Sequence, residues 1–234
     1  MVVALWMVAL VAGGPPGENK GPQKIAVSQF TGLGLDEQVV NAFSRYLETS
    51  IATIESVSLV SSIDVQIALQ SPSASKVRRC REGTRARTRC AVAIGRLVGA
   101  DLVIYGTIGA LGEAFSVNLR AVDVATQREV SKHTATLSGG RDLLIPEVRL
   151  AAFKLVAPDR IVGSLKIDVD IAGVVVEIDG RRVGVTPLKN SVTNLAPGPH
   201  VIVMRRPGFR EVQKEFVIEP FETARFKLEL RGLD

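Results

Sequence analysis

Strict alternation of apolar and polar residues marks three segments in the last third of the chain. Ile167, Val169 and Ile171 alternate with polar residues, and similar alternation surrounds Val176 and Leu228. A period of two sends neighbouring side chains to opposite faces, as in a strand with one buried face. The pattern predicts half-buried antiparallel strands, and short strands separated by turn signals are typical of a small β-sandwich.

Turn-forming pairs divide these strands. Asp179-Gly180 can adopt the positive φ angles of a tight hairpin turn. Pro197-Gly198 and Pro207-Gly208 punctuate the later strands. We therefore expect a hairpin at 179–180 and strand boundaries at the two Pro-Gly pairs.

The first two thirds of the chain mix strand-like and helix-like patterns. After Asp36, which can cap a helix, apolar residues recur at helical spacing from Val39 to Ile54. Further helices are predicted at 63–69, 90–97 and 147–155, and strands at 24–30, 57–60, 102–108, 114–122 and 128–137. The order β-α-β-α-α-β-β-β-α indicates a mixed sheet with helices packed on it. The expected fold class is α+β, with a mixed-sheet α/β domain at 24–157 and an all-β sandwich at 164–231.

The N-terminal segment has the composition of an export signal. Residues 1–12 are wholly apolar, and residues 14–23 form a Pro/Gly-rich linker. Such an apolar run is too short to span a bilayer but fits the core of a signal peptide. No Lys or Arg precedes it, so residues 1–13 could instead remain as a weak anchor. The pattern predicts export to the periplasm or cell envelope, with a buried N-terminal strand as the alternative.

The sandwich segment resembles the PEGA domain, a bacterial cell-envelope module. The resemblance rests on Val-Glu-Ile-Asp-Gly at 176–180, Gly-x-Thr-Pro at 184–187, Leu-x-Pro-Gly-x-His at 195–200 and Gly-Phe at 208–209. The family usually has Gly-Tyr at the last site, and its opening Pro-x-Gly-Ala is replaced by Ile-Ala-Gly-Val at 171–174. The framework residues are Asp179, Gly180, Gly184, Thr186, Pro187, Pro197, Gly198, His200, Gly208 and Phe209. Each suits a turn, an extended residue before proline or a strand start, so the motif implies a scaffold without chemistry.

The α/β segment is similar to a second family of domains. Gly99 to Thr107 contains a Gly-Ala-Asp-hydrophobic strand, and Ser116 to Thr126 ends in Val-Asp-x-x-Thr. These motifs resemble the α/β domain of the curli-secretion lipoprotein CsgG and the amino-terminal domain of TolB. The resemblance implies a role in envelope assembly and protein contacts rather than catalysis.

The positive charge of the chain is concentrated in one segment. Overall, 46% hydrophobic and 23% charged residues are ordinary for a globular protein, and the net charge is +5. Residues 76–90 carry a net +6, which leaves −1 for the remainder. A solvated loop is the common explanation, and contact with an anionic envelope surface is the functional one. The candidate contact residues are Lys76, Arg78, Arg79, Arg81, Arg85, Arg87 and Arg89.

Nucleic acid is a poor match for this segment, because it has no interleaved aromatic residue for base stacking. The chain's two cysteines, Cys80 and Cys90, lie at this segment. In an exported protein an even cysteine count predicts a disulfide, with two free thiols as the alternative. The cysteines lack the Cys-x-x-Cys spacing of a redox pair, and no His lies near them in the sequence, so redox and metal chemistry are not favoured.

The sequence offers no recognisable active site. The two histidines, His133 and His200, fall in different predicted domains, and neither lies beside a candidate nucleophile or a metal-spaced carboxylate. Residues 31–34, Thr-Gly-Leu-Gly, lack the remaining residues of a dinucleotide or phosphate loop, so we interpret them as a turn. We therefore expect no catalysis, cofactor or metal.

Two functions from different classes fit these observations. The preferred one is a non-catalytic envelope protein that acts as an interaction or scaffold module, with an envelope protein or an anionic envelope surface as its partner. The alternative is a periplasmic ligand-binding or enzyme-accessory protein that uses a cleft between its domains. A mostly apolar cleft with converging polar groups would favour the second function.

Overall fold

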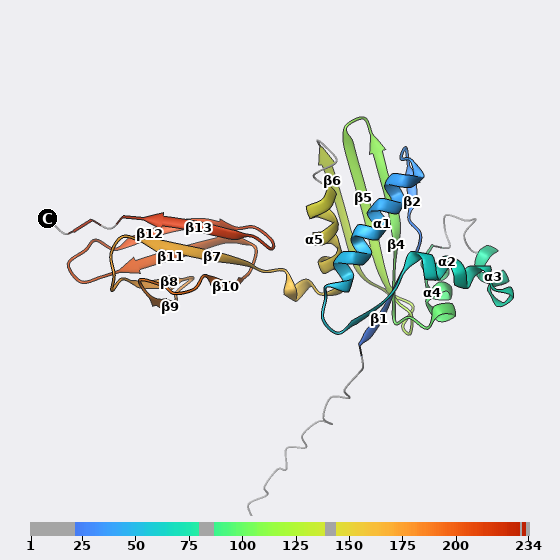
Figure 1. Ribbon diagram of the computed structural model, residues 1–234, viewed down its shortest axis with the longest axis horizontal. Coiled ribbons are helices and arrows are strands. Elements are labelled where there is room, and N and C mark those ends of the chain that lie inside the picture. Colours follow the sequence, from blue (N-terminus) through green and yellow to red (C-terminus); the bar gives the residue numbers. More distant parts are fainter. Residues whose placement is uncertain (1–21, 80–86, 139–143, 230, 233–234) are drawn as a thin grey trace, which may run out of the picture.

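The chain forms an α/β domain followed by a β-sandwich, as the sequence predicts (Figure 1). The computed structural model describes residues 22–79, 87–138, 144–229 and 231–232. The predicted signal segment, 1–13, and nearly all of the predicted linker lie outside these residues, so both stay predictions. No helix within the described residues is long and apolar enough to cross a membrane.

A mixed six-stranded sheet forms the centre of the α/β domain. Its strand order is β3-β1-β4-β5-β6, with β2 paired to β4. The pairings of β1 with β3 and β4, and of β2 with β4, are parallel, whereas those of β5 with β4 and β6 are antiparallel. The strands are β1 (Gln23–Val27), β2 (Thr31–Leu33), β3 (Val57–Val60), β4 (Leu102–Leu111), β5 (Ala114–Asp123) and β6 (Glu129–Ser138).

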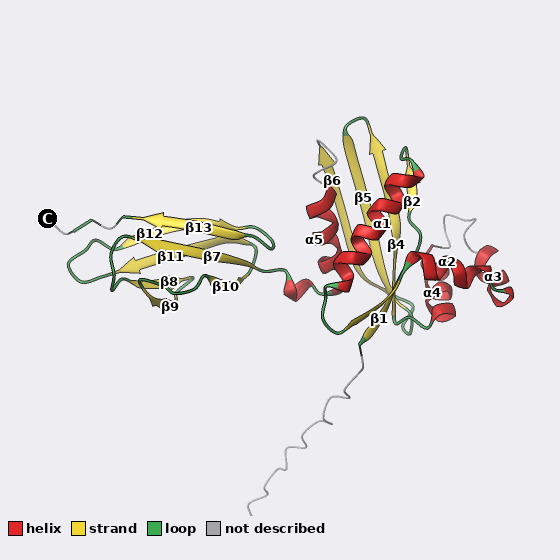
Figure 2. Ribbon diagram, in the orientation of Figure 1, coloured by secondary structure: helices red, strands yellow, loops and turns green. Residues whose placement is uncertain are grey.

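Helices cover both faces of this sheet (Figure 2). α1 (Glu37–Ala52) and α5 (Leu144–Val156) pack on one face, and α2 (Ser62–Gln70) and α4 (Arg87–Val98) on the other; α3 (Ser75–Arg79) follows a 3-10 turn (Pro72–Ala74). Ile25 and Val27 of β1 enter the first core, whereas Ala26 between them enters the second. The alternating side chains of one strand therefore supply two separate cores.

Two expectations about the segment before α1 need correction. Residues 31–34 were interpreted as a turn, but Thr31–Leu33 form strand β2 beside β4. The glycines serve close packing, because a Cβ on Gly32 would lie 2.7 Å from Val40 and one on Gly34 would lie 2.7 Å from the Ala110 carbonyl oxygen. Asp36 does occupy the N-cap position of α1, but its side chain makes no capping hydrogen bond.

The C-terminal domain is a sandwich of two sheets. One has the order β10-β7-β13, and the other has the order β12-β11-β8-β9. The strands are β7 (Gly163–Val169), β8 (Val175–Ile178), β9 (Arg181–Val185), β10 (Val192–Leu195), β11 (Gly198–Arg205), β12 (Val212–Ile218) and β13 (Thr223–Leu228). Buried residues from both sheets, among them Leu165, Val176, Ile202 and Met204, form one core.

The predicted hairpin is confirmed, whereas the predicted antiparallel direction is wrong for one pair of strands. Asp179 and Gly180 have φ angles of 50° and 75° and join β8 to β9, whose pairing is antiparallel. However, β7 and β13 pair in parallel, although alternation suggested antiparallel strands. Alternation reports which side chains are buried; it does not report the direction of the neighbouring strand. The chain leaves β7 for the other sheet and returns to β13 in the same direction.

Candidate functional site

A pocket of about 630 Å³ lies where the two domains meet. Its walls come from the second half of α5, from the connection between the domains and from two turns of the sandwich. The lining residues are Leu150, Lys154, Pro158, Asp159, Ile161, Val162, Asn194, Ala196, Pro197 and Pro220. The connection itself contains a 3-10 turn at Pro158–Arg160.

The pocket is mostly apolar with a few polar groups. Pro158, Pro197 and Pro220 come from three separate segments and present ring carbons but no N–H donor. Lys154 and Asp159 bring opposite charges to the lining, and neither has an ion-pair partner among the described residues. Apolar concave sites with few convergent polar groups, placed between domains, are typical of small-ligand binding.

Phe221 makes the aromatic contact between the domains. It lies in the turn from β12 to β13, and its ring centroid is 4.8 Å from that of Phe153 on α5. The guanidinium of Arg149, one turn earlier on α5, stands 4.3 Å from the centre of the same ring. The Phe221 N–H donates a 2.9 Å hydrogen bond to the Val162 carbonyl oxygen. The turn that carries Pro220 is therefore attached to both α5 and the interdomain connection.

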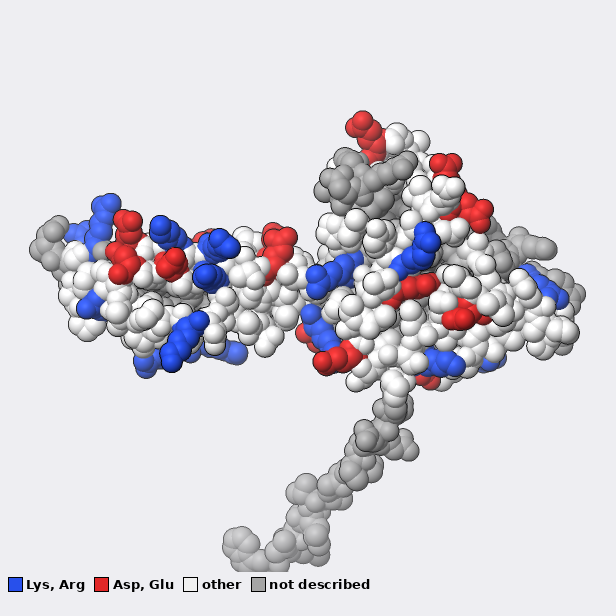
Figure 3. All heavy atoms as spheres, viewed as in Figure 1, with Lys and Arg blue, Asp and Glu red and all other residues white. Residues whose placement is uncertain are grey.

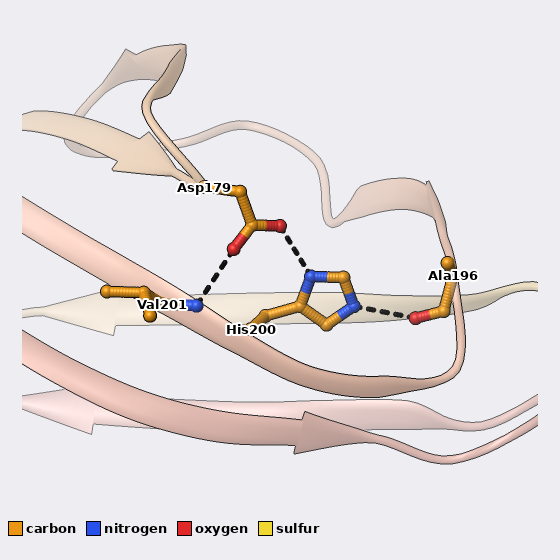
Figure 4. Close-up of polar contacts among 4 residues, drawn as sticks. All are labelled: Asp179, Ala196, His200 and Val201. Atoms are coloured by element: carbon orange, nitrogen blue, oxygen red, sulfur yellow. Dashed lines mark hydrogen bonds and ion pairs between the residues drawn. The ribbon is translucent and has the colours of Figure 1, made fainter.

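A histidine–carboxylate pair supports another wall of the pocket (Figure 4). His200 Nδ1 lies 2.6 Å from Asp179 Oδ2, and His200 Nε2 lies 2.6 Å from the carbonyl oxygen of Ala196, a lining residue. The other Asp179 oxygen accepts a 2.9 Å hydrogen bond from the Val201 N–H. Both ring nitrogens of His200 face acceptors, so the imidazolium, with two N–H donors, satisfies both contacts.

These contacts shift the pKa of both side chains. The hydrogen bond to the Ala196 carbonyl raises the pKa of His200 above 6.5, and the Asp179 carboxylate adds to this increase. The Val201 N–H lowers the pKa of Asp179 below 3.8, with His200 as the next cause. Each shift favours the charged form of its residue, so the pair is ionic over the pH range between the two values.

Comparison with known proteins identifies the sandwich. Residues 162–233 match the family model of the PEGA domain. The C-terminal domain is a PEGA domain. The predicted resemblance of this segment to the PEGA domain is therefore confirmed. No curated protein matches the chain.

Three solved structures illustrate more distant likenesses. The LpoB C-terminal domain from Salmonella enterica is 18% identical with a TM-score of 0.38, over 52% of this chain and 87% of that one. The PelC dodecamer from Paraburkholderia phytofirmans is 14% identical with a TM-score of 0.36, over 59% and 86%. TolB from Acinetobacter baumannii is 15% identical with a TM-score of 0.41, over 87% and 51%. At these values the likenesses support no functional argument.

Most of the PEGA framework residues have structural roles. Thr186 is only 5% exposed; its hydroxyl accepts a 3.0 Å hydrogen bond from the Val174 N–H and donates a 2.6 Å bond to the Ile171 carbonyl oxygen. A cis peptide bond joins Thr186 to Pro187. Phe209 lies 4.9 Å from the Arg206 guanidinium, whereas Pro197 lines the pocket. Of the framework residues, Pro197 lines the pocket, and His200, held by Asp179, supports the lining residue Ala196.

The basic segment is only partly described. Arg78 donates hydrogen bonds to the carbonyl oxygens of Leu69 and Ser71, at 2.9 Å and 3.4 Å, so this guanidinium supports the end of α2. Arg89 is exposed on α4. Arg81 and Arg85, and the side chains of Lys76, Arg79 and Arg87, lie outside the description. Contact of this segment with an anionic surface therefore stays a prediction.

The predicted disulfide also stays untested. Cys90 is 7% exposed on α4, and Cys80 lies outside the described residues.

Sequence inspection missed a second histidine–carboxylate pair. His133 on β6 is 5% exposed, and its Nε2 contacts the Glu147 carboxylate on α5. His133 is paired with Leu119 of β5, and the Leu119 side chain belongs to the first core. His133 therefore lies on the face of the sheet that α1 and α5 cover. Neither residue falls in a motif, so only the packing of α5 on β6 reveals the pair. Within the described residues, no group of three or more His, Cys, Asp or Glu could hold a metal ion.

Proposed function

We propose that this chain is a non-catalytic interaction module of the bacterial cell envelope, in which the PEGA domain binds a partner protein. The match of residues 162–233 to the PEGA family supports this proposal. The predicted export signal at 1–13 supports the location.

We propose the outer face of the β12-β11-β8-β9 sheet as the surface that contacts the partner. A solvent-facing sheet surface normally carries polar residues. Here five valines share this face: Val185 and Val217 are 38% and 56% exposed, and Val175, Val201 and Val203 are half-buried. We call this set the valine face. Polar residues lie between these valines: Val203 is paired with Glu177 and Gln213, and Glu177 and Arg205 form an ion pair at 2.6 Å. A surface that mixes exposed apolar side chains with polar ones is suited to a protein contact.

The edge of the same sheet offers a second means of contact. β12 ends the sheet, and no other strand among the described residues pairs with its outer side. An edge strand can accept an extended segment of a partner through main-chain hydrogen bonds. Val217, which belongs to both the edge and the valine face, is the residue at which such a partner would meet side chain and backbone together.

Site-specific photocrosslinking in cells tests this function. A photoreactive residue at Val217 should crosslink to one partner in envelope fractions, whereas one at Thr193, exposed on β10 of the opposite sheet, should not. Val217→Glu should reduce recovery of the same partner by affinity purification about tenfold or more, because a charge replaces an apolar contact. Equal crosslinking at both positions contradicts the proposal. Sequencing the N-terminus of the recovered chain tests export and processing in the same sample.

The interdomain pocket favours a second candidate function, the binding of a small ligand. Its volume of about 630 Å³ and its apolar lining with a few polar groups fit such a site. A fragment library screened by NMR should shift resonances of Leu150, Ile161 and Ala196 together. Hits that perturb only one domain argue against a ligand between the two.

A further inference from the structure

Few residues hold the two domains together. Outside the connection at 157–162, no helix or strand of the described α/β domain packs extensively on a strand of the PEGA domain. Figure 1 shows the PEGA domain extending away from the α/β domain with contact at one end only. Domains joined by a small interface move relative to one another unless specific contacts prevent it. The orientation therefore depends on individual side chains at the junction.

Phe221 is the side chain best placed to fix this orientation. Its ring packs on Phe153 at 4.8 Å, with the Arg149 guanidinium 4.3 Å from its centre. Arg149 and Phe153 are four residues apart, so they lie on one ridge of α5 and contact the same ring. Phe153 is only 9% exposed in the docked arrangement, although it is not among the α5 residues of the first core, so the Phe221 ring contributes to its cover. We call Phe221, Phe153 and Arg149 the Phe221 latch.

The backbone of Phe221 adopts an unusual conformation. Its φ angle is 63°, in the left-handed region. The other described non-glycine residues with positive φ are Ser56, Gln127, Asp179 and Asn194, all small or polar. A bulky aromatic residue in this region is strained, and such strain persists only where the surroundings impose it. Here the N–H bond to Val162 holds the backbone while the ring points toward α5.

The latch also determines whether the pocket exists. Leu150 and Lys154 lie one residue beyond Arg149 and Phe153 on α5 and line the α/β side of the pocket. Pro220, the neighbour of Phe221, lines the PEGA side together with Asn194 and Ala196. If Phe221 leaves α5, the PEGA walls move away from the α5 wall. Closure of the latch and formation of the pocket are therefore one event.

We propose that Phe221 is a releasable latch that docks the PEGA domain on α5 and so assembles the interdomain pocket. Because the pocket exists only in the docked state, any ligand that fills it stabilises docking, and docking strengthens that ligand's binding by the same factor. A partner that binds the PEGA domain more tightly in the undocked state has the opposite effect and weakens binding in the pocket.

Backbone ¹⁵N relaxation of the full-length protein tests the latch without any ligand. In the wild type, residues of β4 and β5 and residues of β11 and β12 should share one rotational correlation time, because docked domains tumble together. Phe221→Ala should separate them into two correlation times, the shorter one belonging to the smaller PEGA domain. Two distinct times in the wild type, or one shared time in Phe221→Ala, would overturn the proposal.

Two further variants separate docking from folding. Phe209→Ala is the matched control, because Phe209 also contacts an arginine, Arg206 at 4.9 Å, but lies outside the junction; it should keep one correlation time. Arg149→Glu changes only an exposed residue of α5, so the PEGA domain stays folded, yet a carboxylate repels the face of the Phe221 ring. It should also give two correlation times. If Arg149→Glu keeps one shared correlation time while Phe221→Ala unfolds the PEGA domain, Phe221 has only a structural role and the latch proposal is rejected.

Discussion

Each domain contains a histidine paired with a carboxylate, but the two pairs lie in different surroundings. The α/β domain contains His133 with Glu147, and the PEGA domain contains His200 with Asp179. The first pair joins a strand to a helix inside a core, with His133 5% exposed. The second joins a turn to a strand; the His200 side chain is 10% exposed, but that of Asp179 is 49% exposed, against 14% for Glu147. Burial and surroundings, rather than residue type, decide whether such a pair stabilises a core or supports a surface turn.

Removing one partner of the buried pair should have the largest effect. His133→Ala leaves the Glu147 carboxylate without its partner in a largely buried place and should lower the free energy of unfolding of the α/β domain by about 3 kcal/mol. Urea denaturation followed by hydrogen exchange in β6 measures this loss. The exposed neighbour Lys132 provides the control, since Lys132→Ala should change stability by less than about 0.5 kcal/mol. Equal losses of stability in His133→Ala and Lys132→Ala would show that the buried pair does not stabilise the core.

The buried hydroxyl of Thr186 in the PEGA domain gives a second test of how burial affects the cost of losing a polar contact. Thr186→Val keeps the shape of the side chain but deprives the Val174 N–H and the Ile171 carbonyl of their hydrogen bonds. We expect a loss of about 2 kcal/mol in PEGA stability. Thr193→Val, at an exposed position of β10, should be close to neutral. If Thr186→Val costs less than His200→Ala, burial is not the deciding factor in this domain.

The pair of His200 with the half-exposed Asp179 should show the smallest effect, and that effect should depend on pH. The raised pKa of His200 means that its stabilisation is complete below pH 6.5 and is lost as pH rises through the folded-state pKa. The lowered pKa of Asp179 means that its contribution is present above pH 3.8 and is lost as pH falls below that value. The charges facing the pair are those of its own members and of Arg181 beside Asp179.

PEGA stability should therefore be highest at roughly pH 4–6.5. It should fall by about 1 kcal/mol or less at alkaline pH, since partly exposed pairs contribute little. Denaturant midpoints of the PEGA domain at pH 5.5 and pH 9 measure this change. His200→Gln should remove most of the alkaline difference. A wild-type midpoint that rises with pH would contradict the assigned direction.

Sequence periodicity predicted most of the fold, because apolar spacing reports directly on burial. The helical spacing from Val39 to Ile54 corresponds to α1, which ends at Ala52, and the alternation around Val176 corresponds to β8. Periodicity carries no information on strand direction, which explains the wrong antiparallel expectation for β7 and β13. Gly32 and Gly34 suggested a turn because glycine is common in turns. Here these positions need glycine for another reason, the close approach of this segment to β4 and α1.

The candidate site was much harder to predict. His200 and Asp179 were both recognised as framework residues, but 21 positions separate them and no local pattern shows that they touch. Phe221 carried no signal, since a lone Phe in a turn resembles any partly buried aromatic. The pocket depends on segments as distant as 150 and 220, and only the packing of one domain on the other brings them together.

Surface charge gives a further contrast between sequence and structure. On the face shown in Figure 3, Lys and Arg are interspersed with Asp and Glu over both domains, without a large area of one sign. The charge concentration seen in the sequence at 76–90 lies mostly outside the described residues. Salt-dependent retention of wild type and an Arg89→Ala variant in envelope fractions remains the test of that segment.

The parallel pairing of β7 with β13 has a practical consequence for labelling. The chain enters the PEGA domain at Gly163, beside the junction, and leaves β13 at Leu228, at the opposite end of the domain. Six residues of extended chain measure about 20 Å. A fluorophore attached at residue 232, which is paired with Phe209, would report binding at the remote end of the PEGA domain and would not respond to binding between the domains, so the two events can be recorded separately in one molecule.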